Sequence, residues 1–255
     1  MTKRQFVMLI LTLTIMAGIP RSADAGADIQ MTILPNEILM GATYDGQRIQ
    51  VIGSVPSDTT AIIRVTGHME ASKLKKKGRA LGMLWMNQDT IEISHVPNVF
   101  LLYLPREISA APFPMSALGL DGIRREAQIR AREKGHDALF EEFVKLKQDA
   151  RLYGTFPRAI AYGKGTGSEK SFRCTLDMPS DLPAGTYQVE VFAVKNGSVV
   201  ARARQPIIAR EIGMPAFISS LALNHSTIYG VLAVLVAAMA GLLTGVVFKG
   251  GKGAH

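Results

Sequence analysis

Residues 186–208 read TYQVEVFAVKNGSVVARARQPII, and two runs that alternate apolar with polar side chains flank Asn196-Gly197. Asn-Gly is the strongest two-residue turn signal, so this stretch predicts an antiparallel hairpin. Immediately upstream, residues 181–187 read DLPAGTY, which places Tyr187 at a strand entry just after a glycine turn. That arrangement is typical of the tyrosine corner of immunoglobulin-like sandwiches, in which the phenol bonds back to nearby backbone; an ordinary half-buried strand tyrosine is the alternative.

Further strand-like runs lie on the N-terminal side of this hairpin, bounded by turn residues such as Pro35-Asn36 and Asp45-Gly46. They cover residues 28–34, 47–54, 60–67, 82–87, 90–94, 98–104, 157–163 and 170–177. From about 116 to 153 the apolar spacing becomes helical, most clearly at 136–152, and the charged segment 120–134 predicts a second short helix. We therefore expect a mainly β fold, an immunoglobulin-like or Greek-key β-sandwich with a helical insertion at about 116–153, plus one C-terminal transmembrane helix.

Three features refine the expected core. Residues 98–105, NVFLLYLP, are apolar on both strand faces, so one face enters the sandwich. The other face needs cover from the helix at 136–152, which we favour, or from a partner. Cys174 is the only cysteine and alternates with apolar neighbours, which predicts a buried core thiol, with a reactive or intermolecular thiol as the alternative. Trp85, the only tryptophan, is expected to pack between the two sheets.

The two ends of the chain predict export and anchoring. Lys3-Arg4, a short apolar run and Ala23-Asp24-Ala25 indicate a cleaved signal peptide, with a retained anchor as the alternative. Residues 229–248 carry no charge and as a helix would reach about 30 Å, the thickness of a bilayer core; a buried soluble helix is the alternative. Lys249 and Lys252 follow and favour a cytoplasmic tail. The expected organisation is a signal peptide at 1–25, an exported domain at 26–216, a juxtamembrane linker at 217–228, a transmembrane helix at 229–248 and a tail at 249–255.

Charge and motif content argue against several functions. The exported part, residues 26–216, holds 24 Lys+Arg and 20 Asp+Glu, a balance too weak for a nucleic-acid binder. The sequence shows no G-x-S-x-G, H-E-x-x-H, C-x-x-C or P-loop pattern, and no histidine spacing suggests convergent metal ligands. We therefore expect no catalytic residues, no cofactor and no metal site.

Two groups of residues are candidates for interaction. The first is a stripe of small residues spaced four apart in the apolar C-terminal span, which would let a second helix approach closely; a chance pattern in an Ala/Gly-rich span is the alternative. It consists of Ala233, Ala237, Gly241 and Gly245. The second is a basic cluster that would contact anionic headgroups or an acidic partner, unless it is simply a solvated hairpin loop. It consists of Lys73, Lys75, Lys76, Lys77 and Arg79.

The chain resembles an alphaproteobacterial transmembrane protein family over nearly its whole length. The resemblance rests on MLWMN at 83–87, ISHVPNVFLLYLPREI at 93–108, Leu152-Tyr153, LPAGTYQVEVFAVKNGSVVARARQPI at 182–207 and the IYG-led apolar span. It implies a signal peptide, an exported domain and a single C-terminal helix, and it assigns no catalytic residues. It also implies an association with sulfite-exporter-type permeases.

These observations lead to one expected function and two alternatives. We expect a single-pass protein of the cytoplasmic (inner) membrane, with its main domain in the periplasm, that acts without catalysis as an accessory or assembly partner. Its partners would be the lipid bilayer and either a transporter-type membrane protein or a second copy of the chain. An exported ligand-binding or adhesion module is the first alternative, and an exported hydrolase or redox enzyme is the second.

Overall fold

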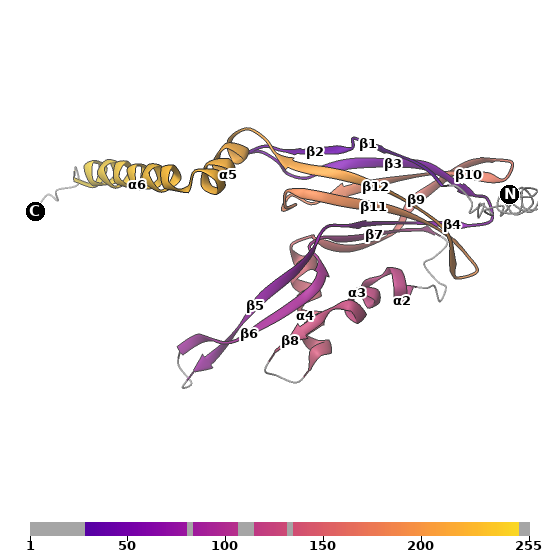
Figure 1. Ribbon diagram of the computed structural model, residues 1–255, viewed down its shortest axis with the longest axis horizontal. Helices are drawn as coiled ribbons and strands as arrows, with labels where there is room; N and C mark the ends of the chain where they lie inside the picture. The colour runs from indigo at the N-terminus through magenta and orange to yellow at the C-terminus, as the bar shows by residue number, and fades with distance from the viewer. Residues whose placement is uncertain (1–28, 81–83, 107–114, 132–134, 250–255) are drawn as a thin grey trace, which may run out of the picture.

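The computed structural model describes residues 29–80, 84–106, 115–131 and 135–249. It shows an elongated β body from one end of which two helices extend toward the C-terminus (Figure 1). The expected signal peptide, 1–25, and residues 250–255 of the expected tail lie outside the described residues.

A nine-stranded sheet curls over to form the body. Its strands, in spatial order, are β1 (Gln30–Leu34), β3 (Gln47–Pro56), β10 (Glu169–Met178), β9 (Tyr153–Thr166), β7 (Phe100–Pro105), β4 (Thr60–Thr66), β11 (Gly185–Lys195), β12 (Ser198–Glu211) and β2 (Glu37–Met40). The first four strands form one layer and the last five the other, which is the strand order of an immunoglobulin-type sandwich. The prediction of a mainly β fold of this kind is confirmed.

The main core lies between the two layers because alternate residues of each strand point inward. In β10, Phe172, Cys174, Leu176 and Met178 are all buried, while the residues between them are exposed. Full burial of an apolar side chain of this size is worth about 1.5–3 kcal/mol. The prediction that Cys174 is a core residue is confirmed.

The hairpin around Asn196-Gly197 forms as expected. Lys195 pairs with Ser198 across these two residues, both of which have positive φ, +50° and +79°. The Tyr187 hydroxyl donates a hydrogen bond of 2.5 Å to the Pro183 carbonyl oxygen, so the tyrosine corner is present.

A second core covers the outer face of the layer that contains β7, β4 and β11. The insertion forms α2 (Met115–Leu118), α3 (Leu120–Glu126) and α4 (His136–Asp149). Phe140 and Phe143 of α4 pack with Phe100 and Leu102 of β7, whose alternate residues face the main core. The prediction that the 136–152 helix covers the second face of 98–105 is confirmed. The helix expected at 120–134 is corrected in part, because Gln128–Arg130 forms the short strand β8. This strand pairs with β6 (Leu84–Pro97) and turns Ile129 toward the second core.

A long hairpin projects from the body and forms a three-stranded sheet with β8 (Figure 1). It consists of β5 (Met69–Ala80) and β6 (Leu84–Pro97). The described residues of the strands expected at 82–87 and 90–94 therefore belong to the single strand β6. The basic cluster, for which a solvated hairpin loop was the alternative, lies within β5. Trp85 pairs through its backbone with Arg79 on this hairpin, so its expected place between the sandwich layers is wrong.

The C-terminal segment consists of two helices, α5 (Met214–Asn224) and α6 (Ser226–Lys249). The expected linker, 217–228, is thus helical over most of its length. Backbone bonding ties it closely to the sandwich, since the Ile212 amide donates to the Met40 carbonyl oxygen at the end of β2, 2.9 Å away.

Candidate functional site

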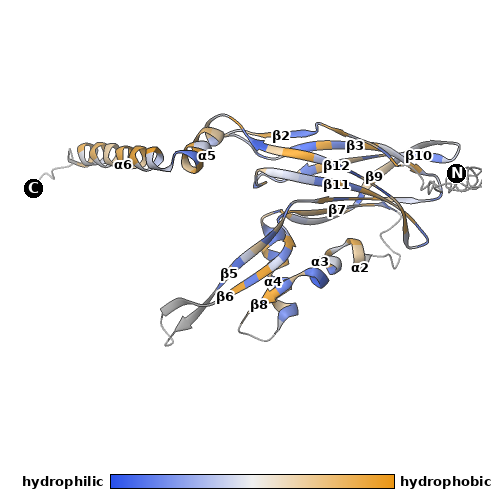
Figure 2. Cartoon of the chain, in the orientation of Figure 1, coloured by the Kyte–Doolittle hydropathy of each residue, from blue (hydrophilic) through white to orange (hydrophobic). Residues whose placement is uncertain are grey.

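Helix α6 has the length and composition of a membrane span. Its apolar part, Ser226–Val246, contains 21 residues and rises about 32 Å, and the described chain buries none of it. Figure 2 shows the apolar colouring along α6. The Thr244 hydroxyl donates to the Ala240 carbonyl oxygen at 2.7 Å, so it presents no unpaired polar group to its surroundings.

The stripe of small residues runs along α6, and its surface is not covered by any described part of the chain. A β-carbon added at Gly241 or Gly245 would meet no atom within 4 Å. No described part of the chain therefore packs against these two glycines. Such a surface allows another helix to approach closely through backbone and dispersion contacts.

Helix α5 presents apolar side chains between the sandwich and α6. Met214, Phe217, Ile218 and Leu223 are all exposed, and none of the residues of α5 is buried. Its only polar side chains are Ser219, Ser220 and Asn224, with no charge. A helix with this composition, placed directly before a membrane span, suits the interface between headgroups and acyl chains.

The predicted basic cluster lies on the edge strand of the small sheet. Strand β5 pairs only with β6, so its other edge is free within the described chain. Lys73 and Lys75 are exposed and lie opposite Glu92 and Thr90. For Lys76, Lys77 and Arg79 the structure describes the backbone pairing only. The hairpin slants away from the sandwich and toward the end of the molecule at which α5 lies (Figure 1).

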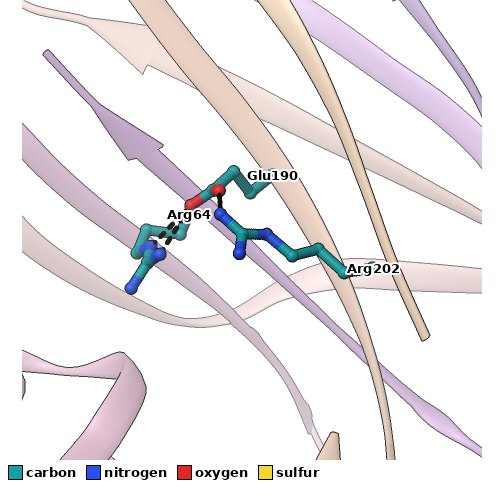
Figure 3. Close-up of polar contacts among 3 residues, drawn as sticks. All are labelled: Arg64, Glu190 and Arg202. Carbon is teal, nitrogen blue, oxygen red and sulfur yellow. Dashed lines mark hydrogen bonds and ion pairs between the residues drawn. The ribbon is translucent and has the colours of Figure 1, made fainter. Parts of the chain in front are cut away.

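Sequence reasoning missed a charged cluster on the outer face of the sandwich (Figure 3). Glu190 of β11 accepts hydrogen bonds from Arg64 of β4, at 3.0 Å to Nε and 2.6 Å to Nη2, and from Nη2 of Arg202 of β12. The Glu190 side chain is only 5% exposed. Desolvation raises its pKa, but the bonds from Arg202 and Arg64 outweigh that effect and the net pKa is lowered. The available signal was one acidic residue inside the otherwise apolar run VEVFAV.

A cavity of about 320 Å³ lies over this cluster. Its floor is the outer face of β4, β11 and β12. One wall is α3, which contributes Gly122 and Ile123, together with Gly119 just before the helix. Arg204 and His95 also line it. The cavity combines guanidinium groups with apolar surface, as ligand sites often do.

A larger cavity, of about 700 Å³, lies where β3, β9 and β10 meet the end of α4. Its charged lining residues are Asp45, Arg48, Arg151 and Asp177, all of them exposed, and no histidine lines it. Across the described residues, no group of three or more His, Cys, Asp or Glu side chains lies close enough to hold a metal ion.

The fold and the exposed C-terminal helix together define a class of protein: an immunoglobulin-type sandwich with a helical insertion and, among the described residues, one candidate membrane span. Comparison with protein families then identifies the group. The model of the family described as "Putative transmembrane protein (Alph_Pro_TM)" matches residues 28–250, and the chain belongs to this family.

Two other comparisons add no functional argument. No curated protein matches the chain. Among solved structures, a chain from "Structural basis of T cell specificity and activation by the bacterial superantigen toxic shock syndrome toxin-1" aligns over 73% of this chain and 100% of its own length. Its sequence identity is 8% and its TM-score 0.24, values too low for any inference.

Proposed function

We propose that this protein is a non-enzymatic accessory or assembly subunit of a transporter-type membrane protein, anchored in the cytoplasmic membrane by α6. The sandwich lies on the periplasmic side and the tail after Lys249 in the cytoplasm. A permease of the sulfite-exporter type is the partner that the family resemblance favours.

One observation carries this proposal: the apolar part of α6, Ser226–Val246, is exposed throughout, and its glycine surface is open. Lipid can solvate the large apolar side chains around the helix, but a groove of small residues gains most from a second helix. The short, uncharged α5 holds the sandwich at the membrane surface, where it can cover the outer side of that partner. The basic residues of β5 lie toward the same end and would add contact with anionic headgroups.

The experiment is co-purification in mild detergent with quantitative mass spectrometry. Gly241→Leu combined with Gly245→Leu fills the stripe and should reduce recovery of the partner at least about tenfold, because the helix backbones can no longer approach. Met239→Leu combined with Val246→Leu alters the opposite side of α6 and should leave recovery unchanged. Equal recovery with both double variants would remove the stripe from the proposal.

Self-association is the competing outcome. Two copies of the chain carrying different tags are expressed together, and one tag is captured. If the second tag is recovered and no other membrane protein is enriched, the stripe joins two copies and the accessory role fails.

A further inference from the structure

The Arg64–Glu190–Arg202 cluster holds more hydrogen-bond donors than its acceptor can use. Both oxygens of Glu190 are occupied, Oε2 by Arg64 and Oε1 by Arg202. Each guanidinium group has five N–H donors, of which Arg64 uses two and Arg202 one in these contacts. The remaining donors belong to groups that line the 320 Å³ cavity.

Arg204 adds a third guanidinium group to this cavity. It is the direct cross-strand neighbour of Glu190, so its side chain lies on the same face of the sheet. Within the described part of the chain it forms no ion pair. Three arginines against Glu190 give the cluster a charge of +2, and Glu126, which also lines the cavity, reduces it to +1.

Aromatic stacking holds two of the arginines in place. The guanidinium carbons of Arg64 and Arg202 lie 5.0 and 5.4 Å from the centre of the Phe192 ring. Glu190 links the same two groups, so their positions do not depend on a ligand. When a ligand binds to such a preorganised site, the free-energy cost of ordering the side chains is smaller.

Apolar side chains line another part of the cavity, beside the polar residues Thr66, His95 and Gln188. Phe100 and Ile123 are buried beneath it, and Met69, which is exposed, lies at its edge. A ligand that uses this surface must carry an apolar body beside its charged group.

We propose that this cavity, the α3 groove, binds a monocarboxylate that carries a small apolar body. Guanidinium forks match the two oxygens of a carboxylate, and the cavity charge of +1 balances one negative charge, whereas a phosphate carries close to two. The apolar body lies against Ile123 and the exposed Met69. The assignment is independent of the role of α6, since the groove belongs to the sandwich and the insertion.

Calorimetric titration of the full chain in nanodiscs tests this assignment, with benzoate as the probe. Benzamide has nearly the same shape without the charge, and inorganic phosphate has charge without the apolar body. Benzoate should bind at least about tenfold more tightly than either, because charge-assisted hydrogen bonds and apolar burial act together. Equal affinity for benzoate and benzamide, tighter binding of phosphate, or no binding of benzoate would overturn the proposal.

Variants locate the binding. Arg204→Gln removes a free guanidinium without uncovering Glu190 and should weaken benzoate binding about tenfold or more. Arg204→Lys keeps the charge and should restore part of the affinity. Arg210→Gln, on the same strand but paired with Glu37, is the matched control and should bind as the wild type does. Equal losses in Arg204→Gln and Arg210→Gln would place benzoate elsewhere and refute the groove; the melting temperature of each variant verifies that it is folded.

Discussion

Cys174 and Glu190 both lie on strands of the sandwich, but they face opposite sides of their layers. Cys174 points into the main core and is 1% exposed. Burial raises the pKa of its thiol to about 12, and the nearby Asp177 charge adds to the increase. Glu190 points outward beneath the insertion, where two arginines reverse the effect of burial and lower its pKa. The surroundings of each side chain thus decide in which direction its pKa shifts.

For Cys174 this predicts protection from alkylation. The folded chain should resist maleimide near pH 8, and the chain unfolded in urea should react, because only the thiolate is nucleophilic. The unfolded thiol titrates near its ordinary value of 9.0, well below the folded one. Its contribution to stability is therefore complete below about pH 9 and is lost as the pH rises toward 12. Intact-mass analysis follows the labelling.

Val200→Cys supplies the control for this measurement. Val200 of β12 is 44% exposed on the sandwich, away from α5 and α6, so a thiol at that position should label quickly in the folded chain. Labelling of wild-type Cys174 at a comparable rate under native conditions would contradict the core placement.

At the scale of elements, α4 is the cover for β7. Phe143 is 1% exposed and makes an edge-on ring contact with Tyr153, with ring centres 5.8 Å apart. The Tyr153 hydroxyl in turn donates to the Pro97 carbonyl oxygen, 2.6 Å away, at the end of β6. The helix, the body and the projecting hairpin therefore meet at this aromatic contact.

Phe143→Ala should lower the free energy of unfolding by about 3–5 kcal/mol, since it leaves a cavity in the second core. Urea unfolding of the full chain in detergent, followed by circular dichroism, measures the change. Leu146→Ala on the same helix is the control. Leu146 is 53% exposed, so its removal should change stability by less than about 0.5 kcal/mol. Similar losses for the two variants would show that α4 does not form the cover.

At the scale of the whole molecule, the sandwich is built to fold in water, whereas the surface of α6 is suited to lipid. The sandwich has two apolar cores of its own, whereas α6 has none of its candidate span buried. Helix α5 is the boundary between the two environments, and it leaves little chain for a flexible tether.

Removal of α6 should therefore release the domain from the membrane. A chain that ends after His225 should appear in the soluble fraction, while the full chain should stay with the membrane after carbonate washing. Gly241→Leu with Gly245→Leu is the control and should also stay, because it fills the stripe but keeps the span apolar. Release of the full chain by carbonate would disprove a bilayer-spanning α6.

Local sequence patterns determine much of this protein by themselves. Alternation with period two, the Asn196-Gly197 turn and the glycine before Tyr187 specify the hairpin, because they act through neighbouring backbone geometry. Likewise, the uncharged length of α6 follows from bilayer thickness alone. The double-sided apolar pattern of 98–105 also predicts its helical cover, since each face of a strand needs its own contacts.

Only the tertiary structure decided which distant strands are neighbours. The predicted hairpin already places Arg202 near Glu190, but Arg64 is 126 residues from Glu190. No local pattern requires that β4 lie beside this hairpin. For the same reason the sequence did not predict that residues 84–97 form one projecting strand with Trp85 outside the sandwich. A short run of alternating polar and apolar residues fits a sandwich strand and a projecting strand equally well. Strand order results from how the whole chain buries its apolar area, so a site assembled across strands emerges only with the fold.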